Sequence, residues 1–208
     1  MRDYRDADES AWVACRLRAF LDSSYRDDVQ QHRERYRNPA VRLVAEHMPT
    51  GELIGFLDIE YESSPGQVCN FPDARGGVIW HLGVVPEYRR AGIATLMWEK
   101  AQLQLIAAGV SRVQAWSQDD EPASRWYRDN GFAVKSSYLN VYVRGLMGHF
   151  PLKKLLPISS GDWQYGHVRS LNFEAPIEDR AKLEPLSYRM HEVREYERTI
   201  GHKEPKAA

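Results

Sequence analysis

The sequence lacks the features that mark several large classes of protein. Its 208 residues include only two cysteines, Cys15 and Cys69, which are too few for a disulfide framework and wrongly spaced for a zinc site. No apolar run approaches the ~20 residues that a membrane-spanning helix needs, and the charged start from Arg2 does not fit a secretory signal. These absences predict a cytoplasmic protein with reduced thiols, no membrane segment and no bound metal.

An excess of either charge is also missing, because 28 basic and 29 acidic residues leave a net charge of −1. No overall field therefore favours nucleic acid or an anionic membrane as a partner. The length favours a single domain with a substantial core. We expect this domain to span residues 1–200, with a core at 1–144, a C-terminal extension and last strand at 145–200, and a flexible tail at 201–208. The role of residues 145–187 stays open.

Hydrophobic periodicity and turn residues predict alternating strands and helices. In the first part of the chain we expect a strand at 1–5, a helix begun by Asp6 or Asp8, a polar helix at 26–36, and hairpin strands at 41–45 and 53–60. The first helix should bury the face that carries Val13, Leu17, Phe20 and Leu21.

The second part of the chain continues the alternation after a loop at 63–77. We expect a strand at 78–85, a helix from Gly92 to Gly109, a strand at 112–116, a short helix begun by Asp119 or Asp120, and strands at 138–144 and 188–196. This order predicts a mixed α/β sheet with a central parallel part, where ligands bind at the carboxyl ends of strands.

A turn that contains a glycine follows the most apolar strand. The run 78–85 is apolar almost throughout, as expected when both faces of a strand are covered, and Gly92 opens the next helical pattern. The start of a helix presents free amides and partial positive charge, and glycine allows a phosphate to come close. We name residues 89–95 the phosphate cradle and expect a pyrophosphate-bearing cofactor there. Neither a Walker lysine nor the three spaced glycines of a dinucleotide loop is present, and alone the pattern also fits an ordinary strand-to-helix connection.

Two segments together resemble a known family. Residues 82–94 read LGVVPEYRRAGIA and resemble the acetyl-coenzyme A motif of the GNAT N-acetyltransferase superfamily; residues 123–132 read ASRWYRDNGF and resemble its second signature. The resemblance implies a mixed, mostly antiparallel sheet with a central parallel strand pair splayed to hold acetyl-CoA, and helices on both faces.

The resemblance also implies where acetyl-CoA binds. The pyrophosphate would take backbone N–H groups of residues 90–95, and the pantetheine would pair like an extra strand beside Val84 and Val85. The implied cofactor-binding residues are Val84, Val85, Arg89, Arg90, Ala91, Gly92, Ile93, Ala94, Thr95, Asp120, Ala123 and Tyr127. Asp120 stands where the family usually carries an asparagine, which puts the pantetheine contact at that position in doubt.

Acetyl transfer to an amine needs a group that takes a proton from the nitrogen and a group that gives the leaving thiolate a proton or a hydrogen bond. Tyr127 is our candidate acid, because the resembled family directs this tyrosine at the coenzyme sulfur; the alternative is a packed core tyrosine. His81 is our candidate base, since its reference pKa of about 6.5 suits the task. Glu60 and Glu62 are rivals, although Glu62 could simply be solvated, and a water chain without a dedicated base is a further alternative.

We therefore expect an acetyl-CoA-dependent N-acetyltransferase that acetylates a primary amine of a small molecule by direct attack in a ternary complex. One alternative is a non-catalytic acyl-CoA-binding regulatory module, and another is acetylation of a protein N-terminus or lysine. The acidic residues Asp22, Asp27 and Asp28 border the acceptor region in the resembled family; they could attract a cationic amine, or serve as helix caps on a wet surface. Homodimers are frequent in that family, so a homodimer stays open.

Overall fold

The structure is a computed structural model that describes residues 1–71, 73–144 and 170–201. Two compact units are present: residues 1–135 with 195–208 form the first, and residues 136–194 form the second. Each is described by itself below. The single domain that we expect over 1–200 stays a prediction, and the expected tail beyond Gly201 lies outside the described residues.

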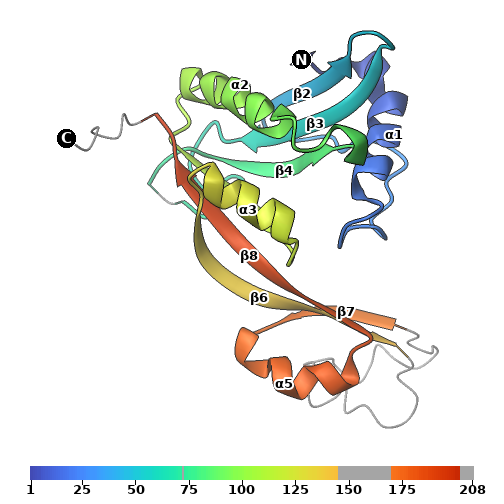
Figure 1. The fold of residues 1–208 in the computed structure, drawn as a ribbon. Helices are drawn as coiled ribbons and strands as arrows, with labels where there is room; N and C mark the ends of the chain where they lie inside the picture. The colour runs from blue at the N-terminus through green and yellow to red at the C-terminus, as the bar shows by residue number, and fades with distance from the viewer. Residues whose placement is uncertain (72, 145–169, 202–208) are drawn as a thin grey trace. The chain divides into compact units, whose positions relative to one another are not determined.

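The strands form a mixed sheet in the order β1-β2-β3-β4-β5-β8-β6-β7 (Figure 1). Neighbours from β1 to β4 pair antiparallel, whereas β4 and β5 pair parallel. This confirms the expected mostly antiparallel sheet with one central parallel pair. The elements that lie within the first unit are β1 (Arg2–Asp3), α1 (Glu9–Phe20), β2 (Ala40–His47), β3 (Glu52–Tyr61), β4 (Gly76–Val84), α2 (Ile93–Ala107), β5 (Arg112–Ser117) and α3 (Glu121–Asp129).

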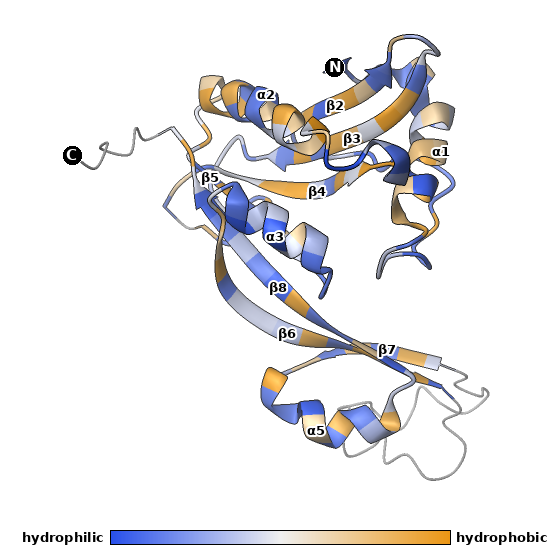
Figure 2. Ribbon diagram, in the orientation of Figure 1, coloured by the Kyte–Doolittle hydropathy of each residue, from blue (hydrophilic) through white to orange (hydrophobic). Residues whose placement is uncertain are grey.

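Helices cover both faces of the β3–β4 hairpin. A Cβ placed on Gly55 would lie 3.3 Å from Met97 of α2, whereas one placed on Gly83 would overlap the Phe56 ring and lie 3.2 Å from Ala19 of α1. Since Gly55 and Phe56 are neighbours in β3 and point to opposite faces, α1 and α2 lie on opposite sides of the sheet. The strands between them carry mostly apolar side chains, while β8 is largely hydrophilic (Figure 2).

Two expectations for the N-terminal region are wrong. Residues 26–36 form no helix, because their polar groups bind β3 and α1 instead, as detailed below. In α1 the buried face carries Trp12, Cys15, Arg16 and Ala19. Val13 and Phe20 pack partly against the core, but Leu17 and Leu21 are 44% and 64% exposed, so the buried face is centred about a quarter-turn away from the predicted one.

The second unit is built on the outer parts of two long strands, β6 (Ala133–Arg144) and β8 (Arg189–Thr199). β6 pairs antiparallel with β7 (Ser170–Ala175), and a short helix, α5 (Arg180–Leu183), follows. A separate small core joins these elements and contains Leu139, Val141, Val143, Ala175 and Leu183. The expected strands at 138–144 and 188–196 are thus confirmed, whereas β7 and α5 lie where the sequence predicted no element.

Candidate active site

The parallel pair β4 and β5 separates partway along its length. The two strands pair only from Gly76 opposite Arg112 to Ile79 opposite Ala115. Beyond Ile79, β4 continues paired with β3 alone, while β5 runs on to Ser117. We call this unpaired region the split. Backbone groups at its edges are available to an extended ligand, as the expected pantetheine position requires.

A β-bulge in β4 sets which way the side chains face at the split. Asp58 pairs with His81 and Ile59 pairs with Ile79, so Trp80 has no partner in β3. Since Asp58 and Ile59 point to opposite faces, the extra residue turns His81 onto the face of Asp58 and away from that of Ile79. The His81 ring accordingly lies edge-on to Trp12 of α1, with ring centroids 5.4 Å apart.

The segment that we name the phosphate cradle is open at its glycine. α2 begins at Ile93 behind Gly92, which has a φ of 77° and open space where a Cβ would stand. Within the described part of the chain, the backbone N–H groups of residues 90–95 find no acceptor, whereas that of Leu96 donates to Gly92 O at 3.0 Å. Residues 89–92 are exposed. Six amides at the start of a helix therefore face an unfilled corner at the end of β4.

The side chain of Arg89 is engaged elsewhere. Its guanidinium donates to both carboxylate oxygens of Asp22 at 2.7 and 2.8 Å, to Ala19 O at 2.8 Å and to Val84 O at 3.1 Å. The hydrogen bond from Arg89 also lowers the pKa of Asp22. This side chain thus fastens the end of α1 to the end of β4, and a phosphate role for Arg89 stays a prediction.

The three aspartates that follow α1 are each close to an arginine. Besides Asp22 with Arg89, Asp28 accepts from Arg16 at 2.5 Å, and Asp27 lies 3.9 Å from Arg26. A cationic acceptor would have to compete with these arginines. The interpretation of this cluster as a structural, wet surface therefore fits better than attraction of an amine.

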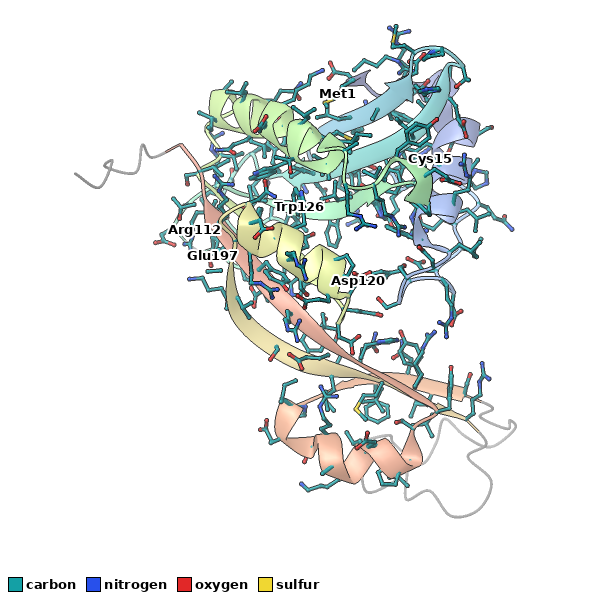
Figure 3. All side chains as sticks on the ribbon, in the orientation of Figure 1. Met1, Cys15, Arg112, Asp120, Trp126 and Glu197 are labelled. Atoms are coloured by element: carbon teal, nitrogen blue, oxygen red, sulfur yellow. The ribbon has the colours of Figure 1, made fainter. Side chains whose placement is uncertain are left out.

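Side-chain hydrogen bonds join α3 to the start of α2 and cap the start of α3. Trp126 Nε1 donates to Thr95 Oγ1 at 3.1 Å, and Figure 3 shows Trp126 on the side of α3 toward α2. Asp120 is the N-cap of α3, and its carboxylate accepts from Ala123 N at 3.1 Å. The cap expected at Asp119 or Asp120 is Asp120. A pantetheine contact by Asp120 or Ala123 stays a prediction.

Tyr127 is nearly enclosed, with 6% of its surface exposed. Its ring stacks on Tyr196 at 4.6 Å between centroids, so the packing interpretation holds at least for the ring. Burial raises the pKa of Tyr127, and the phenols of Tyr25 and Tyr196 raise it further. The Tyr25 hydroxyl in turn accepts from Gln118 N, just past the end of β5, at 2.8 Å. Tyr127 therefore stays protonated at neutral pH, as a proton donor must.

His81 lies among charged side chains that the sequence analysis missed. The ring is 7% exposed, and its Nε2 lies 3.3 Å from Oε2 of Glu34. Asp58, opposite His81 in β3, is fully buried and accepts from Arg33 Nε at 3.0 Å and from the Tyr36 hydroxyl at 3.2 Å. Burial raises the pKa of Asp58 overall, because it outweighs the opposite effects of Arg33 and His81. The base candidate therefore sits beside two carboxylates.

Glu60 has a structural set of partners. Its carboxylate accepts from Asn38 N at 3.0 Å, from Asn38 Nδ2 at 2.9 Å and from Trp80 Nε1 at 2.9 Å. These bonds hold the connection between α1 and β2, residues 21–39, against β3. A base role for Glu60 stays a prediction, but a base needs a free oxygen and all three bonds would compete with it.

Glu62 is fully buried rather than solvated. Its carboxylate accepts from the backbone N–H groups of Val68, Cys69 and Gly76 at 2.7 to 2.9 Å. Burial alone would raise the pKa of Glu62, but these backbone hydrogen bonds outweigh it and lower the pKa. Glu62 therefore organises the loop that follows β3, so its rivalry with His81 as a base has little support.

One sequence signal could have pointed to the missed residues. Asp58 and Glu60 stand in the otherwise apolar run of β3, and carboxylates in a buried strand require partners. The polar stretch 26–38 holds those partners, namely Arg33, Tyr36 and Asn38. Reading the two segments together would have predicted an anchored connection instead of a helix.

No described helix has the length and apolar character needed to cross a membrane. Among residues 1–71, 73–144 and 170–201, no group of three or more His, Cys, Asp and Glu side chains is placed to hold a metal ion.

Comparisons with solved structures support the same fold. An acetyltransferase of the GNAT family from Streptococcus pneumoniae matches with a TM-score of 0.59 and 16% identity, over 96% of this chain and 98% of that one. The ribosomal-protein-S18-alanine N-acetyltransferase from Escherichia coli matches with a TM-score of 0.54 and 12% identity, over 100% and 97%. Arabidopsis thaliana NAA60, in complex with a bisubstrate analogue, gives a TM-score of 0.54 and 15% identity, over 96% and 97%.

Comparison by sequence gives the family. No curated protein sequence matches the chain. The family model described as acetyltransferase (GNAT) family matches residues 3–132, a stretch that runs from β1 through α3 and contains both the split and the phosphate cradle. Because this match covers more than half of the sequence, the chain belongs to the GNAT family of acetyltransferases.

Proposed function

We propose that the chain is an acetyl-CoA-dependent N-acetyltransferase that acetylates a primary amine of a small molecule by direct attack in a ternary complex. The observation that carries this proposal is the row of six unpaired amides, residues 90–95, around the open position of Gly92. Such a row at a helix start selects a phosphate-bearing ligand. The adjoining split between β4 and β5 leaves backbone groups free for an extended arm.

The residues present fit acetyl-CoA. The amides of the cradle would hold its pyrophosphate, and the free edge of β4 at Val84 and Val85 would pair with the pantetheine. Two backbone groups at that edge are already hydrogen-bonded within the protein: Val84 O accepts from Arg89, and Val85 N donates to Ile54 O. The Val84 N–H is therefore the donor we assign to the pantetheine. When bound, the coenzyme supplies the activated acetyl thioester.

Tyr127 and His81 are the residues we assign to proton transfer. Tyr127 donates a proton to the leaving thiolate, since its burial keeps the phenol protonated. His81 takes the proton of the attacking nitrogen, and is preferred to Glu60 because the oxygens of Glu60 already accept three hydrogen bonds. A module that only bound acyl-CoA would need neither group.

A compact acceptor is supported by the way the 21–39 connection is fixed. Buried Asp58 holds Arg33 and Tyr36, and Glu60 holds Asn38, so this connection is anchored beside His81 at several points. One of the solved structures named above is a ribosomal-protein-S18-alanine N-acetyltransferase, from Escherichia coli. At 12% identity it shares only the fold with this chain, so protein N-termini form one arm of the test.

The test is release of free coenzyme A thiol from acetyl-CoA with a panel of small primary amines, peptides with free N-termini and lysine peptides. We expect turnover with a small amine. Tyr127→Phe should lower kcat by about 100-fold with coenzyme affinity within a few-fold, whereas Tyr188→Phe, on an exposed tyrosine, should leave both unchanged. Coenzyme binding without turnover on any amine would support the regulatory module, and turnover on peptides alone would move the acceptor to proteins.

A further inference from the structure

The connection between α1 and β2 reaches His81 through a set of specific contacts. Glu9 of α1 accepts from Arg33 N at 3.2 Å, and the Arg33 side chain pairs with buried Asp58. Arg33 also donates to Glu34 O at 3.0 Å. The backbone on both sides of Glu34 is therefore fixed by α1 and β3, and Glu34 is delivered to one place.

The carboxylate of Glu34 is divided between two partners. Its Oε1 accepts from Gln30 Nε2 at 2.8 Å, which leaves Oε2 directed at His81 Nε2, 3.3 Å away. The Glu34 side chain is 44% exposed, while that of His81 is 7% exposed. Glu34 thus closes the outer side of the imidazole and stays in contact with solvent.

This contact selects a tautomer of the imidazole. The 3.3 Å approach is an ion-pair contact without full hydrogen-bond geometry, because buried Nε2 has no hydrogen-bond partner among the described residues. An ionised carboxylate at that distance favours the tautomer with the proton on Nε2 and the lone pair on Nδ1. Contact with His81 is the largest of several causes that lower the pKa of Glu34 to about 2, so the carboxylate is ionised throughout the neutral range. An imidazole oriented by a carboxylate in this way is the arrangement of a general base.

We propose that Glu34 is a positioning residue that holds His81 in the Nε2-protonated tautomer and stabilises the imidazolium formed during acetyl transfer. The inference rests on the proposed function. As the C–N bond forms and the C–S bond breaks, the amine proton goes to Nδ1 of His81 and the thiolate takes a proton from Tyr127. The imidazolium then releases its proton to water, and Tyr127 regains one from water.

Asp58 and Arg16 are the other charged groups that act on this pair. Asp58 faces the ring from β3; its Oδ2 accepts from Arg33 and Tyr36, while its Oδ1 has no hydrogen-bond partner among the described residues. Arg16 on α1 lowers the pKa of Glu34. Glu34 is therefore the carboxylate whose removal changes the charge at His81 without leaving a buried arginine unpaired.

The main test is the pH profile of kcat/KM. Because a nearby carboxylate favours the charged imidazolium, removing it makes the neutral base persist to lower pH. Glu34→Gln should move the acidic limb down by about half to one pH unit and lower the plateau by about tenfold, with coenzyme affinity unchanged. Glu99→Gln, on the exposed face of α2, is the matched control and should leave the profile in place. Gln30→Ala keeps the carboxylate, so it should lower the plateau without moving the limb.

Two outcomes overturn the inference. A lowered plateau with an unmoved limb in Glu34→Gln would mean a structural role alone. The second readout needs neither a variant nor turnover: the ring ¹⁵N shifts of His81 in the wild-type protein should report the proton on Nε2, and a proton on Nδ1 would exclude the proposed contact. Absence of amine acetylation by the wild-type chain would instead remove the proposed function, so the two failures are distinguishable.

Discussion

Gly92 is the residue at which the proposed coenzyme site depends on a left-handed backbone conformation. Its φ of 77° is left-handed, and nothing lies within 4 Å of the position of a Cβ. A side chain here would cost about 1 kcal/mol of backbone strain and would also project toward the unpaired amides. The effects of a side chain on folding and on binding can be separated, because Gly66 has the same left-handed conformation but lies outside the phosphate cradle.

We predict that Gly92→Glu lowers coenzyme A affinity by more than about 100-fold, because it fills the cradle and repels the pyrophosphate. Gly66→Glu is the matched control, since Gly66 has a φ of 80° and is equally unobstructed but lies in the loop after β3. Isothermal titration calorimetry on both variants checks this. Equal affinities in the two variants would remove the phosphate cradle from coenzyme binding.

The connection at residues 21–39 is the element whose position depends most on buried charge. Arg33 and Asp58 form an ion pair at 3.0 Å whose side chains are 6% and 0% exposed. Arg33 also lies over the rings of Tyr4 and Tyr36, 4.7 and 5.0 Å from their centroids. Removing one member of such a pair leaves the other charged and buried.

We predict that Asp58→Asn lowers the free energy of unfolding by about 3 kcal/mol or more. Asp6→Asn is the control, because the Asp6 side chain is 99% exposed and 4.0 Å from Arg42; it should change stability by less than about 0.5 kcal/mol. Chemical denaturation measures both. Similar stabilities for the two variants would mean that the connection does not depend on the buried pair.

Elements defined by local pattern were predictable, whereas those defined by distant partners were not. The strands around residues 41–60 and the start of α2 behind Gly92 follow from alternation and a glycine, and they lie where expected. The 26–36 segment has helix-compatible composition, yet its conformation is set by Glu9 and Asp58 on other elements. Local propensity cannot register those partners.

The candidate site also has parts that follow from local sequence and parts that depend on distant residues. The cradle was visible because its chemistry lies in one continuous stretch, residues 89–95. His81 was identified by its residue type, but its partner Glu34 is 47 positions away in the chain, and the bulge that turns the ring toward it left no mark in the sequence pattern. The surroundings of a base candidate therefore required the pairing of strands to be known.

At the scale of the whole molecule, the two thiols report how tightly the first unit is closed. Cys15 and Cys69 are 2% and 4% exposed and belong to different apolar clusters. Burial raises the pKa of each thiol to about 12. Since the thiolate is the reactive form, neither is nucleophilic at neutral or mildly alkaline pH.

We predict that both thiols resist 5,5′-dithiobis(2-nitrobenzoic acid) in the native protein at pH 8 and react together once guanidinium unfolds it. Their reaction should be at least about 100-fold slower than that of a free thiol, because a pKa of about 12 leaves only about one part in 10,000 of either thiol ionised at that pH. Fast reaction of one thiol in the native state would contradict closure of its cluster and would locate a local opening at Cys15 or at Cys69.

The bulge at Trp80 determines which face of β4 carries His81. The side chains of β4 after Trp80 lie on their present faces because β4 carries one residue more than β3 at this point. Substitutions along this stretch keep the number of residues in β4 constant, so they can change the side chains on the face of His81 one at a time. Insertion or deletion of one residue ahead of His81 would instead move every later side chain of β4 to the opposite face of the sheet. Related sequences should therefore differ in residue type along this stretch but keep its number of residues.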